Sequence, residues 1–242
     1  MNRIIVETTR RWRLPLTCYA WMFTFLGLLT RGRYETFLAA DFLPVIILAT
    51  VILLPLSVFS LLRRRTPRFG ARELLGTAVI LLPLVYIHHS GGATLGAGAF
   101  ATRYVGMGVV PGKAGSIVPE SADNETSLLD LFMNSEKYSG REITVTGMLA
   151  KDTPQVEQIL GVRRPVLFRF AISCCAADAT PLALVLEDGD ADALKDDDWI
   201  AVSGTFRVRS VKGFDLAVLE KASIRAVPPP EQPYLYSQWG LF

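Results

Sequence analysis

Histidine and cysteine are scarce in this sequence of 242 residues, which holds two histidines and three cysteines. His88 and His89 are the histidines, so a Ser-His-Asp or Cys-His catalytic set is excluded from everything that follows them. Cys18 lies in a long apolar run, whereas Cys174 and Cys175 are neighbours. The C-x-x-C spacing of thioredoxin-like proteins is missing. No further cysteine lies outside the apolar runs, so neither Cys174 nor Cys175 has a partner for an ordinary disulfide.

Charge is missing from three long stretches near the N-terminus, which cover residues 14–30, 42–62 and 74–102. A membrane-spanning helix needs about 20 apolar residues. The first run is at the short limit of that range, and the third is strongly apolar only as far as Ile87. We therefore predict a membrane anchor over residues 1–90, with transmembrane helices near 14–30, 42–62 and 73–90.

Arginines are distributed unevenly among the loops of this anchor. The tail before the first run and the loop after the second hold nine, whereas the first loop holds only Arg31 and Arg33. Because Lys and Arg concentrate on the cytoplasmic side, this bias predicts a multi-pass protein of the cell inner (plasma) membrane with an extracytoplasmic C-terminal domain. The basic start also fits a signal peptide, but no small-residue cleavage site follows the first run, so we expect a retained helix.

Acidic residues are few before residue 103 and frequent after it. Residues 1–102 contain 11 Lys+Arg and 4 Asp+Glu, and residues 103–242 contain the remaining 14 and 19. A net charge of +7 thus precedes one of −5. Binding to phosphate backbones needs a positive face, so we expect no nucleic-acid partner for the acidic region.

Composition and periodicity divide the region after the anchor into three parts. Residues 91–120 are rich in Gly and Ala and read as a linker without a core. Residues 121–227 begin with a helix that Ser127 caps and that stops near Gly140, and then show the two-residue period of strands. Residues 228–242 form a tail rich in Pro and aromatic residues.

The strand pattern favours a small β-barrel. Strands are expected near 141–149, 166–173, 181–187, 199–208 and 214–220, with a short last piece near 222–227. Five strands in so short a region, together with bend-like glycines at Gly147 and Gly204, favour an OB-like barrel. A small sandwich is the alternative. The fold class is thus membrane α plus β, with about three transmembrane helices followed by an extracytoplasmic OB-like domain.

Cys174 and Cys175 end the second expected strand and are the most unusual feature of the domain. By alternation from Phe170 and Ile172, Cys174 points inward and Cys175 outward. Neighbouring cysteines form only a strained disulfide. Both sulfurs reach one metal ion if the strand breaks there, and Asp178 then completes the site or orients the turn. A soft or borderline ion such as zinc suits this donor set. The alternative is a packing role for the pair.

Two further clusters of polar residues are candidates for metal binding. His88 and His89 lie at the end of the third apolar run, where imidazole suits several transition metals, and the alternative is a polar cap on the helix end. Six aspartates between residues 188 and 198 form an acidic tract. That tract has Ala193 where a calcium-binding EF-hand loop needs Gly and Trp199 where it needs Glu, so we expect a solvated hairpin loop.

Several stretches resemble the YcgQ-like family of bacterial membrane proteins, which are described as permease subunits. The matching stretches are residues 93–96, 138–147, 172–179, 198–204 and 233–236. The resemblance covers nearly the whole chain but departs in the first two helices. It implies a separate polytopic permease of the YraQ/YcgR type as a partner, a type related to metalloid exporters.

Together with these patterns, the resemblance implies a non-enzymatic accessory subunit of a membrane permease complex. Its extracytoplasmic β domain handles a metal or metalloid, with Cys174, Cys175 and Asp178, and with His88 and His89, as candidate ligands. The alternative is a structural assembly or ligand-binding module in which the cysteine pair only packs.

Overall fold

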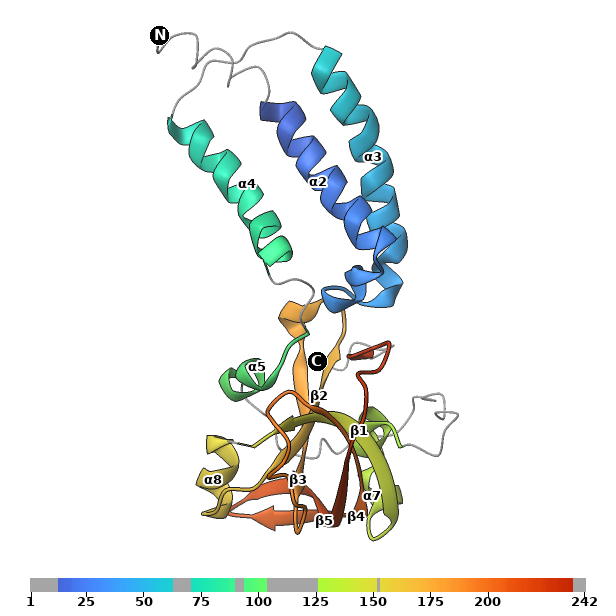
Figure 1. Cartoon of the computed structure of the whole chain (residues 1–242), viewed down its shortest axis with the longest axis vertical. Helices are drawn as coiled ribbons and strands as arrows, with labels where there is room; N and C mark the ends of the chain where they lie inside the picture. Colours follow the sequence, from blue (N-terminus) through green and yellow to red (C-terminus); the bar gives the residue numbers. More distant parts are fainter. Residues whose placement is uncertain (1–12, 63–70, 90–93, 104–125, 152, 237–242) are drawn as a thin grey trace. The chain divides into compact units, whose positions relative to one another are not determined.

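The computed structural model describes residues 13–62, 71–89, 94–103, 126–151 and 153–236 (Figure 1). The chain divides into two compact units, Met1–Ala93 and Thr94–Phe242. Most arginines of the predicted cytoplasmic segments, part of the predicted linker and the last residues of the tail lie outside the described residues.

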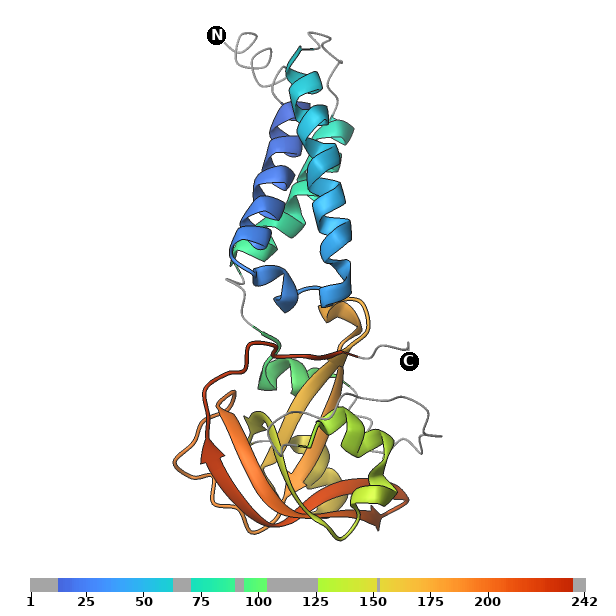
Figure 2. The same cartoon turned by 90° about the vertical axis from the view of Figure 1, so that its right-hand side faces the viewer.

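The first unit is helical, and α2 packs against both other long helices. Its elements are α2 (Arg13–Thr30), η1 (Arg33–Thr36), η2 (Ala40–Phe42), α3 (Leu43–Leu62) and α4 (Ala71–His89). The first two uncharged runs and the strongly apolar start of the third form these long helices, and Pro55 and Pro83 lie inside α3 and α4. After α2, the chain turns at Gly32, whose φ of 64° is one that glycine adopts without strain. Figure 2 shows the three long helices from a second direction.

The surface of these helices is apolar. Eighteen large apolar side chains are between 46% and 74% exposed: Phe23, Leu26, Val45, Ile47, Leu48, Val51, Ile52, Leu54, Leu56, Val58, Phe59, Leu62, Leu75, Val79, Ile80, Leu82, Val85 and Tyr86. By length and composition, one described helix, Ala40–Phe59, could cross a membrane, and the apolar stretches Thr17–Thr30 and Leu75–His89 are shorter. The predicted helix positions are confirmed, and one of the three meets the requirement for a span.

The second unit is a β domain with short helices. Its elements are α5 (Ala97–Thr102), α6 (Leu128–Met133), α7 (Ser135–Tyr138), β1 (Glu142–Ala150), α8 (Pro154–Leu160), β2 (Val166–Ile172), η3 (Ala176–Asp178), β3 (Thr180–Leu186), β4 (Trp199–Val211), β5 (Phe214–Ala226) and β6 (Leu235–Tyr236). The five expected strands are present, and the piece expected near 222–227 continues β5. The helix expected after Ser127 is broken at Asn134 into α6 and α7.

The strands form one mixed sheet in the order β1-β4-β5-β3-β2-β6, and β1 also pairs with β2. This extra pairing joins the two sides of the sheet, so that β1, β4, β5, β3 and β2 form a closed circuit. Pairs are antiparallel except β3–β5 and β2–β6. Lys212 and Gly213, with φ of 52° and 82°, make the two-residue turn between β4 and β5 that type I′ hairpins use.

Two glycines allow the strands to approach closely where the sheet bends. A Cβ at Gly147 would lie 2.6 Å from a methyl carbon of Leu167 on β2, and one at Gly204 would lie 2.7 Å from the carbonyl oxygen of Glu220 on β5. Gly204 also marks the register shift between β4 and β5. A side chain at either position would push paired strands apart, which explains the glycines in strand interiors.

Apolar side chains cover both faces of the strands and make two separate cores. One core lies between α6 and one face of the strands β1 to β5, and it includes Val145, Leu167 and Phe206. The other takes the alternate face, including Phe168 and Phe170, and is covered by α5, α8 and Tyr234. Strand β2 is therefore buried on both sides, so its alternate residues do not divide into a buried face and a solvent-exposed face.

The structure corrects the expectation of a linker at 91–120 in the part that it describes. Residues 94–103 belong to the β domain: Phe100 is 1% exposed and stacks on Phe168 at a centroid distance of 4.5 Å. The small residues around Phe100 allow α5 to lie close on the sheet, which is why their composition looked like that of a linker.

The C-terminal segment is likewise part of the domain as far as Tyr236. Leu235 and Tyr236 form β6, which pairs in parallel with Ala171 and Ile172 at the end of β2. Tyr234 is buried, and its hydroxyl accepts a hydrogen bond from the Leu95 N–H at 3.0 Å. The segment thus closes over the second core beside α5.

Candidate metal-binding turn after strand β2

The Cys174–Cys175 pair lies in the turn that joins β2 to β3. Strand β2 ends at Ile172, and the chain forms the single turn η3 before β3 begins at Thr180. Asp178 closes this turn on itself: its carboxylate oxygens accept the backbone N–H of Ser173 at 3.2 Å and of Cys174 at 2.8 Å. The Asp178 N–H in turn donates to the Cys175 carbonyl at 3.0 Å. Short Asp side chains favour such local bonds to the backbone.

This turn gathers three potential metal ligands. The two sulfur atoms are 3.6 Å apart, and the ligand atoms of Cys174, Cys175 and Asp178 all lie within 4.8 Å of one another. Within the described residues this is the one group of three or more such side chains at that spacing. All three cysteines that the sequence contains are free thiols.

The orientation expected for the two cysteines is wrong. Cys174 is exposed and Cys175 is half-buried, the reverse of the inward and outward directions that alternation predicts. The reason is that β2 ends two residues before Cys174, so the alternation of a strand no longer applies. The break that both sulfurs need in order to face one ion is present.

Asp178 also sets the chemistry of the Cys174 thiol. A hydrogen bond to the Asp178 carboxylate, assisted by one to Cys175, raises the pKa of Cys174 to about 12. Partial burial pushes the pKa of Asp178 upward, but hydrogen bonds from the Cys174 thiol and nearby backbone N–H groups outweigh it, and the pKa is lowered. At neutral pH Cys174 is therefore a protonated thiol that donates to an ionised carboxylate.

Arg103 fixes the turn from outside, and nothing in the sequence pointed to it. Its guanidinium donates to the carbonyl of Ala179 and, at 3.0 Å, to that of Ala176. It also lies 5.8 Å above the ring of Phe170. Arg103 follows α5 directly, more than 70 residues before the turn, so only the docking of α5 on the sheet brings the two together.

His88 and His89 lie in the first unit, at the end of α4. His88 Nε2 is 3.3 Å from the hydroxyl of Thr24 on α2, and both histidines are exposed. The structure therefore gathers three of the five predicted ligands into one turn and assigns both histidines to the other unit.

The acidic tract forms a loop whose carboxylates are used locally. Asp197 accepts the Ala97 N–H at the start of α5, Asp196 accepts the Lys151 N–H at 2.7 Å, and Asp198 accepts the Lys195 N–H at 2.8 Å. These bonds hold the β3–β4 connection against its neighbours. The expectation of a hairpin is wrong, because β5 lies between β3 and β4 in the sheet and the two strands do not pair.

A model of one protein family, the DUF1980 C-terminal domain, matches residues 113–237. This chain belongs to that family. The DUF1980 C-terminal domain is uncharacterised, and the match includes the six strands and the Cys174–Cys175 turn but begins after α5 and Arg103. Comparison with curated proteins and with solved structures gave no match.

Proposed function

We propose that this DUF1980-family chain is a non-enzymatic accessory subunit of a membrane transport assembly, and that its β domain captures a soft metal or metalloid ion as cargo. The observation that carries the proposal is the turn in which the sulfurs of Cys174 and Cys175 and a carboxylate oxygen of Asp178 all lie within 4.8 Å of one another. Thiolate donors select soft and borderline ions such as Zn²⁺, Cu⁺ or arsenite over Mg²⁺ and Ca²⁺.

The donor set suits an ion that is handed on rather than kept. Structural zinc sites are closed by four protein ligands, whereas three ligands leave one position open for water or for a receiving group. A cation such as Zn²⁺ displaces one proton from Cys174 and one from Cys175, and both leave to solvent because the lowered pKa of Asp178 keeps that carboxylate ionised. Binding of such a cation is therefore expected to tighten as pH rises, by up to about a hundredfold per unit while both thiols are protonated. Arsenite instead condenses with the two thiols and releases water, so its binding is not expected to follow this slope.

The first unit supports a membrane location for the assembly. Eighteen exposed apolar side chains on α2, α3 and α4 would be costly in water and suit a lipid environment. In this proposal all three helices cross the membrane, the two shorter ones as a packed group with α3, and the β domain is extracytoplasmic. The closed five-stranded circuit, in which β1 pairs with β2 and β4, supports an OB-like barrel as the carrier of the site.

A polytopic permease of the YraQ/YcgR type is the proposed partner, as the resemblance to YcgQ-like proteins implies. Small and polar residues such as Cys18, Gly27 and Gly76 on the helices suit helix–helix packing in a membrane. Co-purification in mild detergent with a permease expressed from a neighbouring gene is the expected result. Recovery of the chain alone in several detergents would count against this partner.

Metal binding is tested on the full chain in detergent under reducing conditions. Wild type is compared with Cys174→Ser, Cys175→Ser and the double variant, with Cys18→Ser as the matched control. We expect stoichiometric binding of zinc or arsenite by wild type and Cys18→Ser, weaker binding by each single variant and none by the double variant. Equal binding by wild type and the double variant would refute the cargo site.

A structural role for the turn is the second candidate, and one observation favours it. Asp178 already accepts hydrogen bonds from two backbone N–H groups and a thiol, so the turn is satisfied without an ion. Under this alternative, Cys175→Ser leaves every binding measurement unchanged, whereas Asp178→Ala unfolds the turn.

A further inference from the structure

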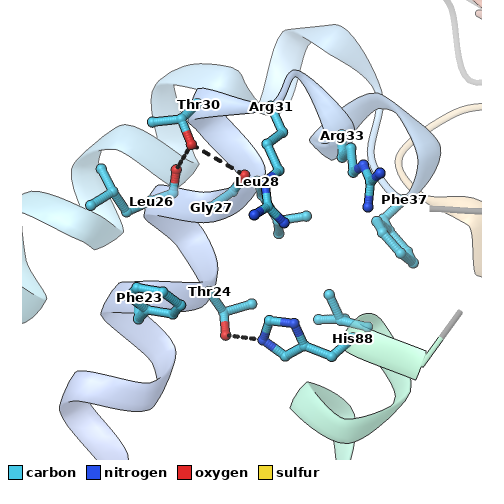
Figure 3. A pocket seen from close by; sticks show the side chains of 11 residues that line it. Phe23, Thr24, Leu26, Gly27, Leu28, Thr30, Arg31, Arg33, Phe37 and His88 are labelled. Carbon is cyan, nitrogen blue, oxygen red and sulfur yellow. Dashed lines mark hydrogen bonds between the residues drawn. The ribbon is translucent and has the colours of Figure 1, made fainter. Parts of the chain in front are cut away.

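A pocket of about 270 Å³ lies in the first unit, between the C-terminal part of α2, the loop that follows it and the end of α4. Apolar side chains of α2 form one part of its wall, and Arg31, Arg33 and His88 contribute nitrogen atoms. In Figure 3, Arg31, Arg33 and Phe37 lie on one side of the space, and Thr24 and His88 on the other. Three nitrogen-bearing side chains from two segments thus surround one space at the end of apolar helices.

Hydrogen bonding fixes the protonation of His88 at one nitrogen. Thr24 is 2% exposed, and its hydroxyl donates its only proton to the Ala20 carbonyl at 2.9 Å. In the 3.3 Å contact between Thr24 and His88, the hydroxyl oxygen must therefore accept, and His88 Nε2 must carry hydrogen. That nitrogen is not free for a metal ion, and the ring is held in place at the pocket wall.

The charge of the pocket favours an anion. Its lining contains two arginines and a histidine but no carboxylate. Glu35, the acidic residue on the neighbouring turn η1, instead accepts the hydroxyl of Tyr34 at 2.9 Å. Guanidinium groups pair with phosphate oxygens through strong, charge-assisted hydrogen bonds.

We propose that this pocket binds the phosphate of an anionic phospholipid headgroup, with Arg31 and Arg33 on one side and the His88 edge on the other. The proposal rests on the membrane location proposed above, not on the metal site. The exposed apolar side chains Phe23 and Leu26 line the same pocket, and they suit the glycerol and acyl portions of the ligand. Basic pockets between transmembrane helices bind anionic lipid headgroups at the cytoplasmic leaflet; in the topology proposed above, this pocket would do so at the outer leaflet.

Lipid retention by the purified full chain in detergent tests the proposal by native mass spectrometry. The probes are phosphatidylglycerol, phosphatidylcholine and inorganic phosphate. Wild type is compared with Arg31→Gln/Arg33→Gln, with the charge-conserving Arg31→Lys/Arg33→Lys, and with Arg141→Gln/Arg225→Gln, which removes two exposed arginines of the β domain. We expect wild type to prefer phosphatidylglycerol over phosphatidylcholine, and the Gln pair to weaken phosphatidylglycerol binding about 30-fold, from about 1 kcal/mol per arginine.

The remaining variants decide between explanations. The lysine pair should keep most of the preference, and the β-domain pair should keep all of it. Equal binding of the two lipids by wild type, or an unchanged preference in the Gln pair, would overturn the proposal. Phosphate binding that is as tight as lipid binding and is lost in the Gln pair would replace the lipid with a free oxyanion. Zinc or arsenite binding at the Cys174–Cys175 turn is measured separately, so the lipid proposal and the metal proposal can each be refuted without the other.

Discussion

Asp178 acts on the Cys174–Cys175 turn in two ways, because the same carboxylate that orders the backbone also disfavours a thiolate beside it. Two backbone N–H groups hold the carboxylate in place, and the Cys174 thiol donates to it. The thiolate is the reactive form of cysteine, so a raised pKa leaves Cys174 slow to react with oxidants and alkylating agents. Metal capture then depends on an ion strong enough to displace the proton.

Removing the Asp178 charge should make Cys174 more reactive. In a Cys175→Ser background, Asp178→Asn lowers the Cys174 pKa from about 12 toward the ordinary thiol value, which increases the thiolate fraction at pH 8. We expect alkylation of Cys174 by iodoacetamide to accelerate at least about tenfold. Asp190→Asn, in the exposed β3–β4 connection, is the control and should leave the rate unchanged. An equal rate in the Asp178→Asn variant would show that the carboxylate does not hold the thiol proton.

For single residues, the sequence predicts which side chains come together in the Cys174–Cys175 turn but not the directions in which they point. Cys174, Cys175 and Asp178 were identifiable because adjacent cysteines and a nearby carboxylate have few purely structural explanations. Their directions depend on where β2 ends, and alternation cannot locate that end. Arg103 was not predictable because its contacts with Ala176 and Ala179 exist only after α5 docks on the sheet.

The anchoring of the turn by α5 makes Arg103 a positioning residue. Arg103→Gln shortens the side chain and removes charged hydrogen bonds to the Ala176 and Ala179 carbonyls. We expect the free energy of unfolding of residues 94–242 to fall by about 1–2 kcal/mol, a value discounted for partial exposure. Urea titration measures it, and metal affinity at the turn should fall in the same variant.

The control for that measurement is Arg163→Gln, which removes an exposed ion pair with Glu157 and should cost about 0.5 kcal/mol or less. Equal losses of unfolding free energy in the two variants would show that Arg103 stabilises the domain no more than an exposed arginine does.

The packing of α5 itself can be measured through Phe100. Phe100→Ala deletes a ring that is 1% exposed and stacked on Phe168, which leaves a cavity between helix and sheet. Large-to-small substitutions of this kind cost about 3–5 kcal/mol. We expect a loss in that range in urea unfolding of residues 94–242, whereas Val162→Ala, at a half-exposed position, should stay within about 0.5 kcal/mol. A loss below 1 kcal/mol for Phe100→Ala would mean that α5 contributes little to the domain.

Elements with a strong period were predictable, and short docked segments were not. Strands β1 to β5 follow from two-residue alternation and β-branched residues, and α2 to α4 follow from long uncharged runs. Helix α5 and strand β6 have no periodic signal of their own, and tertiary contacts with β2 and Phe168 decide their structure. A fragment that begins at residue 121 would lose α5 and Arg103 together.

For the whole molecule, the distribution of arginines makes a prediction about sidedness. Nine arginines flank the apolar runs in the tail and the loop after α3, against Arg31 and Arg33 in the other loop. With three membrane-crossing helices, the N-terminus is cytoplasmic and the β domain is outside. An alkaline phosphatase fusion after Phe242 should be active and one after Arg65 inactive, with the opposite result for a cytoplasmic fluorescent reporter. Phosphatase inactivity after Phe242 would refute the three-span arrangement.

The Leu95–Tyr234 hydrogen bond has a consequence for the engineering of this domain. It places the first and last described segments of the β domain within 3.0 Å at that bond, while the Lys212–Gly213 turn lies exposed between β4 and β5. Domains whose ends meet tolerate circular permutation when the new ends fall in an exposed turn. The domain can therefore be reopened between Lys212 and Gly213 and rejoined by a short linker from residue 236 to residue 94, with every strand pairing retained.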